Sequence, residues 1–150
     1  MIFHTGNKFP KHGLVVTVSA RELGEKIDQY LVSWAANSPE ATESFFIDCE
    51  CPRFSSGDGK GIIKETVRGM DLYFLVDVGN YNCQYTIFGH RNCMSPDDHF
   101  QDLKRLIQAS SGKAHSMTVI MPLLYGSRQH RRNYRESLDC ACALQELQAL

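Results

Sequence analysis

The chain has 150 residues, of which 43% are apolar and 22% are charged, and its net charge is −1. This size and composition are typical of one globular domain that spans residues 1–150. A net charge this close to zero gives no global positive field, so the sequence indicates neither nucleic acid nor a membrane surface as a partner. The sequence contains no apolar run of the ~20 residues that a membrane helix needs and no secretory signal, which indicates a cytoplasmic protein.

The first half of the chain predicts a strand, a helix and a second strand. Residues 14–18, "LVVTV", are a β-branched run typical of a buried strand. Ser19 and Glu22 follow with the spacing of a capping box, which predicts a helix that ends near residue 36. Its apolar face is predicted from the helical spacing of Leu23, Ile27, Tyr30, Leu31 and Trp34. Residues 44–50 predict the second strand, and the Gly- and Ser-rich residues 52–61 predict a turn.

The second half predicts two more strands and two helices. Residues 71–79, "DLYFLVDVG", predict a buried strand, and residues 80–94 predict a loop with a short extended piece. Residues 95–98, "SPDD", are a strong helix start, and Gly112 is a natural stop. A buried strand over residues 117–122 and a last helix from about Arg135 follow. This alternation predicts a three-layer α/β fold, with a mostly parallel sheet flanked by helices.

The six cysteines are expected to be reduced thiols. Without a secretory signal, a reducing compartment is favoured over a disulfide framework. Two pairs have C-x-C spacing, at residues 49–51 and 140–142, which differs from the C-x-x-C spacing of common zinc sites. We therefore predict no protein-held metal site.

The stretch "SMTVIMPLLYGSRQHRR", residues 116–132, places positive charge directly after a predicted strand. In open α/β sheets, ligands bind outside the carboxyl ends of the strands. The following loop carries Arg128, Arg131, Arg132 and Arg135, whose planar guanidinium groups suit phosphate oxygens, and Gln129 adds a polar contact. The alternative is a solvated basic start of a helix. Arginine in the first turn of a helix opposes the helix dipole, which favours the functional interpretation.

The turn "PRFSSGDGKG", residues 52–61, is a second candidate site. An exposed Phe54 beside Asp58 could stack on an adenine ring and accept a hydrogen bond from it. Spacing alone favours the alternative, an ordinary turn with Phe54 packed into the core. Thr66 and Arg68 could bind an anion, although their spacing favours a plain turn. The sequence lacks the Walker, Rossmann and hydrolase-elbow motifs, so those functions lose their main support.

Taken together, these segments resemble the N-terminal half of ribose-phosphate diphosphokinase, the synthetase that makes phosphoribosyl pyrophosphate. The resemblance covers roughly residues 14–150 in order and spacing. Its most specific part is the Arg-Gln pair and the basic residues after a strand that ends in proline. The segments that carry it are "PRFSSGDGKG", "ETVRGMDLYFLVDV", "SPDDHFQDLKRLIQA" and "MTVIMPLLYGSRQHRRNYRESLDCACALQEL".

The resemblance implies a phosphoribosyltransferase-like fold and a two-domain parent enzyme that forms homo-oligomers. That enzyme transfers the diphosphoryl group of ATP, bound with Mg²⁺, to the 1-hydroxyl of ribose 5-phosphate and releases AMP. By the same resemblance, the residues expected to contact ATP are Arg128, Gln129, Asn133, Phe54, Ser56 and Asp58, with Arg128 at the catalytic centre. The Phe54 turn is expected to reach adenine across a subunit interface. Thr66 and Arg68 fall near a regulatory phosphate site.

The sequence also departs from the family pattern. His130 and Ser56 stand where many members have acidic or amide residues, and Asp58 stands where Glu is usual. The acidic pair before Thr-Gly-Gly and the Asp-x-His segment of the family are expected beyond Leu150, in a C-terminal catalytic domain. We therefore expect residues 1–150 alone to be inactive. Two alternatives stay open: a non-catalytic regulatory or assembly homologue, and a phosphoribosyltransferase of nucleotide salvage.

Overall fold

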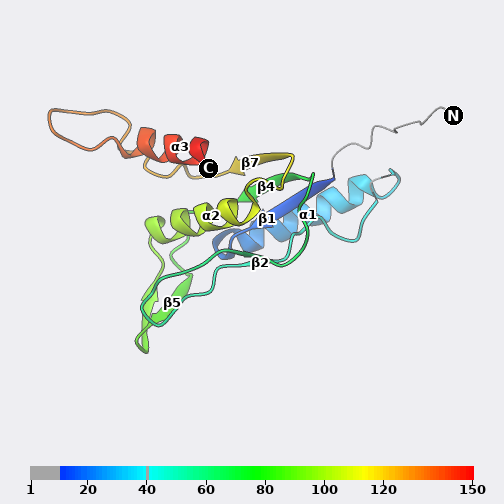
Figure 1. The fold of residues 1–150 in the computed structure, drawn as a ribbon, viewed down its shortest axis with the longest axis horizontal. Helices are drawn as coiled ribbons and strands as arrows, with labels where there is room; N and C mark the ends of the chain where they lie inside the picture. Colours follow the sequence, from blue (N-terminus) through cyan, green and yellow to red (C-terminus); the bar gives the residue numbers. More distant parts are fainter. Residues whose placement is uncertain (1–10, 40) are drawn as a thin grey trace.

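The computed structural model of the chain describes residues 11–39 and 41–150. The helices are α1 (Arg21–Ala35), α2 (Pro96–Ser110) and α3 (Asp139–Ala149), with a short 3-10 turn η1 (Val18–Ala20) before α1. The strands are β1 (His12–Val16), β2 (Cys49–Glu50), β3 (Ile62–Ile63), β4 (Asp71–Leu75), β5 (Gln84–Ile87), β6 (His90–Cys93) and β7 (Ser116–Ile120). Figure 1 shows their arrangement. Among the described residues, no helix has the length and apolar character needed to cross a bilayer.

Three strands form the parallel sheet that the sequence predicts. β4 lies in the centre, between β1 and β7. The strands pair in register, so Val16, Leu75 and Ile120 lie side by side at their carboxyl ends. Two short antiparallel pairs, β2 with β3 and β5 with β6, lie outside this sheet.

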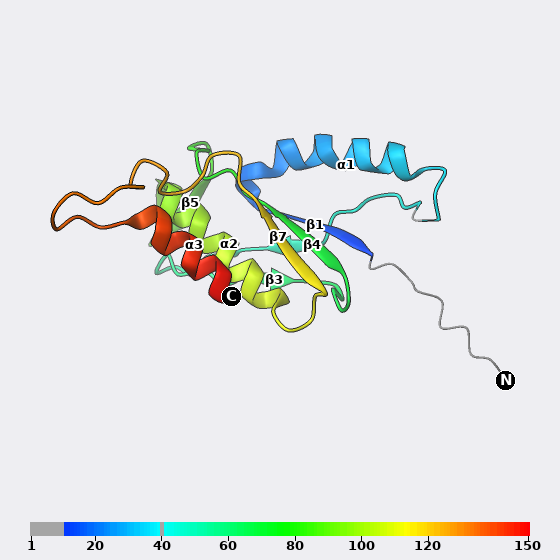
Figure 2. The same cartoon turned by 90° about the horizontal axis from the view of Figure 1, so that it is seen from above.

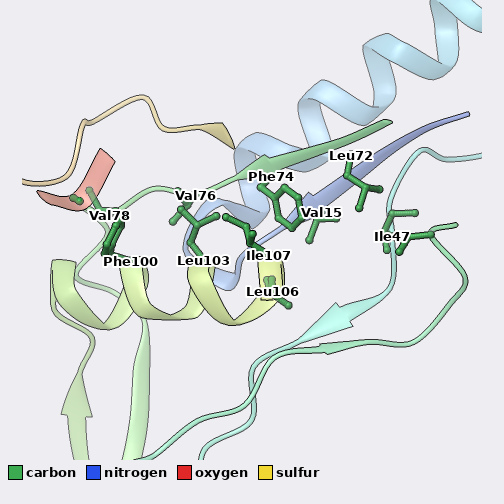
Figure 3. Packing of buried hydrophobic residues seen from close by; sticks show 12 residues of the cluster. Val15, Ile47, Leu72, Phe74, Val76, Val78, Phe100, Leu103, Leu106 and Ile107 are labelled. Atoms are coloured by element: carbon green, nitrogen blue, oxygen red, sulfur yellow. The ribbon is translucent and has the colours of Figure 1, made fainter. Parts of the chain in front are cut away.

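Helices cover both faces of the parallel sheet, which confirms the predicted three-layer α/β fold. Figure 2 shows α1 on one side and α2 with α3 on the other. Alternate residues of β4 serve the two faces: Leu72 and Phe74 belong to the cluster under α2, whereas Leu75 belongs to the cluster under α1. The larger cluster also contains buried apolar residues of α2, drawn in Figure 3: Phe100, Leu103, Leu106 and Ile107.

Helix α2 begins where residues 95–98 predict it. The Asp98 N–H donates to Ser95 Oγ (3.2 Å), and the Ser95 N–H donates back to Asp98 Oδ2 (2.8 Å). These two bonds form a capping box, with Pro96 at the first helical position. The helix ends at Ser110, two residues before Gly112, whose φ of 71° is the conformation expected of a helix stop.

The capping box predicted at Ser19 is wrong. Helix α1 begins after Ala20, and no side chain caps it. The Ser19 Oγ instead accepts a hydrogen bond from the Asp77 N–H (3.2 Å) and lies 2.9 Å from Thr17 Oγ1. These contacts connect the segment after β1 to the segment after β4. They use the Ser19 hydroxyl, which therefore does not cap the helix.

The predicted apolar face of α1 is also largely exposed. Trp34 is 76% exposed and Tyr30 is 65% exposed, and their rings lie 6.2 Å apart. The buried positions of α1 are Gly24, which lies against Val16, and Asp28. Of the predicted face, Ile27 packs against the buried cluster under α1, beside Gly24 and Asp28, while the outer part of that face stays exposed.

A β-hairpin replaces the loop predicted over residues 80–94. β5 and β6 pair antiparallel from Gln84 opposite Cys93 to Ile87 opposite His90. The two residues between them, Phe88 and Gly89, have φ values of 46° and 85°. Paired positive φ values suit a tight hairpin turn. Such a turn usually has the sequence Asn-Gly, whereas phenylalanine rarely adopts a positive φ, and the sequence therefore does not indicate the hairpin.

Three further elements differ from the sequence prediction. β7 lies at the edge of the described sheet and is mostly exposed, whereas a buried strand was expected. The strand predicted over residues 44–50 is reduced to β2 and an isolated bridge between Phe46 and Leu14. Helix α3 begins at Asp139, not near Arg135, so the arginines before it lie in a loop.

Candidate functional site

The carboxyl ends of the parallel strands share one groove. Its volume is about 480 Å³, and its lining includes Ser19 and Ala20 after β1, Asp77 and Asn80 after β4, and Pro122 and Leu123 after β7. The Asn80 amide donates to the Ser19 carbonyl oxygen (2.8 Å), which fixes the loops after β1 and β4 to each other. This is the edge at which open α/β sheets bind ligands.

The loop after β7 is anchored on the start of α2. The Tyr125 ring stacks on Phe100, with ring centroids 4.3 Å apart and planes 4° from parallel. The Tyr125 hydroxyl donates to Asp97 Oδ1 (2.7 Å). This bond, together with partial burial, raises the pKa of Tyr125 to about 12. These contacts fix the first part of the loop, and the basic residues follow it in the sequence, from Arg128 onward.

Gln129 closes the loop onto the start of α3. Its side-chain amide donates to the Ser137 carbonyl oxygen (2.8 Å), and the Cys140 N–H donates to the Gln129 carbonyl oxygen (3.3 Å). The Gln129 N–H donates to the Gly126 carbonyl oxygen (2.9 Å). The residue predicted to contact ATP therefore has a structural role in this conformation.

The basic residues of the loop point their charge into solvent. Arg128, Arg131, Arg132 and Arg135 are exposed, and within the described part of the chain their side chains have no hydrogen-bond or ion-pair partner. Asn133 is exposed as well, and its backbone N–H donates to Glu136 Oε2 (3.1 Å). Figure 1 shows this loop extending beyond the N-terminal end of α3. Because these arginines lie outside the helix, the argument from an unfavourable helix dipole is wrong.

The turn over residues 52–60 presents Phe54 to solvent. Phe54 is 54% exposed, so the expectation that it packs into the core is wrong. The Phe54 N–H donates to the Asp58 carbonyl oxygen (2.7 Å), which closes the turn, and the Ser56 hydroxyl donates to Asp58 Oδ2 (2.7 Å). Lys60 Nζ lies 6.0 Å from the centroid of the Phe54 ring. An aromatic face with a carboxylate beside it can receive a flat, polar ring.

The arginine loop and the Phe54 turn lie in separate parts of one chain. The loop contacts the start of α2 and α3, whereas the turn contacts the β5–β6 hairpin through the bond from the Phe88 N–H to the Ser55 carbonyl oxygen (3.0 Å). Figures 1 and 2 both show the arginine loop and the Phe54 turn at a distance from each other.

Thr66 and Arg68 lie at the opposite edge of the sheet from the arginine loop. Both are exposed, on either side of the buried Val67, and neither side chain has a partner within the described part of the chain. The neighbouring Gly69 N–H donates to the Lys113 carbonyl oxygen (2.9 Å), which places this segment just before β4 and β7.

One pair of charged residues was not identified from the sequence. Arg53 and Asp102 form a buried ion pair between the Phe54 turn and α2, with side chains 8% and 5% exposed. The available signal was an acidic residue between Phe100 and Leu103 on the apolar face of a helix, which requires a partner. His99 is also buried, and its Nε2 donates to the Asn80 carbonyl oxygen (2.7 Å). Among the described residues, no group of three or more His, Cys, Asp or Glu side chains is placed to hold a metal ion.

These features define a class: a parallel α/β domain with a loop of exposed arginines after the carboxyl end of its edge strand β7. Residues 13–150 match the family described as the N-terminal domain of ribose phosphate pyrophosphokinase, and the chain belongs to this family. The fold is similar to a crystal structure of phosphoribosylpyrophosphate synthetase from Mycobacterium smegmatis, with a TM-score of 0.70 and 16% sequence identity. That similarity covers 93% of this chain and 39% of the solved chain. A search of curated proteins found no match.

Proposed function

We propose that this chain is the ATP-binding and subunit-interface domain of a ribose-phosphate diphosphokinase. The observation that supports this most strongly is the group of four exposed arginines on the loop that follows the carboxyl end of β7, whose side chains have no partner among residues 11–39 and 41–150. Several guanidinium groups on one loop suit the closely spaced oxygens of a triphosphate.

In the proposed reaction, the 1-hydroxyl of ribose 5-phosphate attacks the β-phosphorus of ATP. The new bond joins this oxygen to phosphorus, the bond to AMP breaks, and the hydroxyl proton is released. Catalysis of this kind is mainly positioning and charge neutralisation. Arg128 would balance the charge that develops on the transferred group, and Gln129 and Asn133 would orient the nucleotide.

Mg²⁺ would enter bound to the phosphates of ATP, where it would shield their negative charge. The loop fits this arrangement, because arginine and amide side chains suit phosphate oxygens, whereas Mg²⁺ itself prefers carboxylate and water ligands. The chain's own residues would therefore bind the nucleotide, and the phosphates of ATP would bind the Mg²⁺ ion.

The Phe54 turn would bind the adenine ring of ATP held by a neighbouring copy. The separation of the turn from the arginine loop within one chain supports this arrangement. Phe54 would stack on the base, and Ser56 and Asp58 would receive its polar edge. A homo-oligomer is then part of the function, because each site draws on two copies.

Thr66 and Arg68 would bind a regulatory phosphate at the opposite edge of the sheet. Their exposed side chains, without partners in the described part of the chain, support a site that is separate from the arginine loop.

A second candidate function is a non-catalytic homologue that assembles with synthetase subunits. The Gln129 side chain favours it, because its amide nitrogen donates to the carbonyl oxygens of Ser137 (2.8 Å) and Arg131 (3.5 Å) and these bonds compete with a nucleotide for its N–H groups. Such a homologue would self-associate without binding ATP.

Calorimetric titration of the chain with Mg-ATP, at low and at high salt, tests the leading proposal. We expect weak, salt-sensitive binding that Arg128→Ala reduces at least about tenfold at low salt, since a hydrogen bond to a charged group contributes roughly 1.5–3 kcal/mol. The matched control is Arg91→Ala, which removes another exposed arginine, on β6, and should leave affinity unchanged. No binding even at low salt, with self-association retained in light scattering, would favour the assembly homologue. Because the acidic pair before Thr-Gly-Gly of the family does not occur in the sequence, we expect no AMP release.

A further inference from the structure

The turn that carries Phe54 is fixed to α2 by an ion pair that is almost fully buried. Arg53 precedes Phe54 directly, and its guanidinium group binds the Asp102 carboxylate at two points. Arg53 Nη1 lies 2.5 Å from Asp102 Oδ1, and Nη2 lies 2.9 Å from Oδ2. Arg105 Nη1 also donates to Asp102 Oδ1 (2.7 Å). A bidentate pair fixes both the position and the plane of the guanidinium group.

The glycines of this segment make room for the pair. A Cβ at Gly59 would lie 2.2 Å from Arg53 Nη1 and 2.8 Å from Arg105 Nη1. A Cβ at Gly61 would lie 2.5 Å from the backbone carbon and oxygen of Arg105. The turn therefore lies directly against α2, and its glycine content reflects this contact.

The β5–β6 hairpin holds the turn from a second side. The Arg53 guanidinium carbon lies 5.1 Å from the centroid of the Tyr85 ring, which is a cation–π contact. The Phe88 N–H donates to the Ser55 carbonyl oxygen (3.0 Å). Both residues that flank Phe54 are thus bonded to other elements, whereas Phe54 itself is exposed.

We propose that Arg53 and Asp102 are positioning residues, whose ion pair sets the orientation in which Phe54 meets the nucleotide base. An exposed ring on a free glycine-rich turn would lose conformational freedom on binding, and this loss would weaken the stack. The ion pair and the hairpin contacts restrict the turn before the ligand arrives. This inference rests on the proposed role of Phe54 in binding adenine, and it adds the residues that orient Phe54.

The test compares ATP with inorganic tripolyphosphate, which carries the phosphates but no base. The measured quantity is the ratio of the two affinities in calorimetric titrations of the full chain with Mg²⁺ present. Arg53→Lys keeps the charge and removes the bidentate geometry. The double variant Arg53→Met with Asp102→Leu replaces the pair with apolar side chains, an exchange that proteins often tolerate. Phe54→Ala is measured beside them as the reference for loss of the base contact.

We expect wild type to prefer ATP, and both variants to lose at least about fivefold in ATP affinity with tripolyphosphate affinity unchanged, as expected for a weakened base stack. The double variant decides the outcome if Arg53→Lys does not fold. An unchanged ratio in these variants, with a lowered ratio in Phe54→Ala, would overturn the positioning role and leave the adenine site intact. No ATP preference in wild type would refute the adenine site, and the positioning role with it.

Discussion

Replacing Asp102 with asparagine removes one negative charge from the buried contact between the Phe54 turn and α2. The variant keeps the shape of the side chain, so Arg53 and Arg105 then face a neutral amide. An exposed ion pair contributes only about 0–1 kcal/mol, whereas breaking a buried pair costs about 3–5 kcal/mol. The exposed fractions of 8% for Arg53 and 5% for Asp102 place this pair in the buried class. Arg105 is 19% exposed and can turn toward solvent, so we expect a loss near the lower end, about 3 kcal/mol.

Urea denaturation of the two proteins measures this loss as a difference in the free energy of unfolding. The matched control is Glu25→Gln, which breaks the Arg21–Glu25 pair on α1, whose side chains are 64% and 52% exposed. We expect the control to cost about 0.5 kcal/mol or less. A loss for Asp102→Asn below about 1 kcal/mol, comparable with the control, would show that the pair does not hold the turn to α2.

Three further predictions concern the loop anchor, the turn and the amino edge of the sheet. Tyr125→Phe removes the bond to Asp97 but keeps the stack, so denaturation should show a loss of about 1 kcal/mol, whereas the fully exposed Tyr134→Phe should show none. Gly61→Ala should cost roughly 1–3 kcal/mol in the same assay, because its Cβ meets the α2 backbone; a neutral result would contradict that close approach. Hydrogen bonds from Ser116 and His115 lower the pKa of Asp71 in the folded chain, so their stabilisation is present above the unfolded pKa of about 3.9 and is lost as pH falls through the lower folded value. In acid titrations, the stability difference between wild type and Asp71→Asn should shrink over that range; a difference that stays constant there would contradict the assignment.

The sequence predicts the central layer of the fold because its signals there are local. β1, β4 and β7 are short β-branched or apolar runs, and α2 begins at a Ser-Pro-Asp-Asp segment whose capping geometry needs only neighbouring residues. The arginine loop is predictable for the same reason, since its four arginines lie within eight consecutive residues, 128–135, after a strand.

The features that escaped prediction depend on distant contacts. Ser19 has the local spacing of a cap, but the end of β4 offers it a competing partner in Asp77. The β5–β6 hairpin turns through Phe88 at positive φ, which residue preferences argue against. The pairing of Arg53 with Asp102 spans 49 positions, so no local pattern reveals it.

We propose that the loop after β7 is the polyphosphate site. The most direct measurement is an NMR titration of the labelled chain with Mg-ATP that follows the arginine side-chain Nε–Hε signals and the backbone amides. We predict that the largest shifts occur at Arg128 and its neighbours in residues 126–136, that they weaken as salt is added, and that the signals of Arg91 stay in place. Shifts concentrated at Thr66 and Arg68, or spread evenly over the surface arginines, would show that the loop after β7 is not the polyphosphate site.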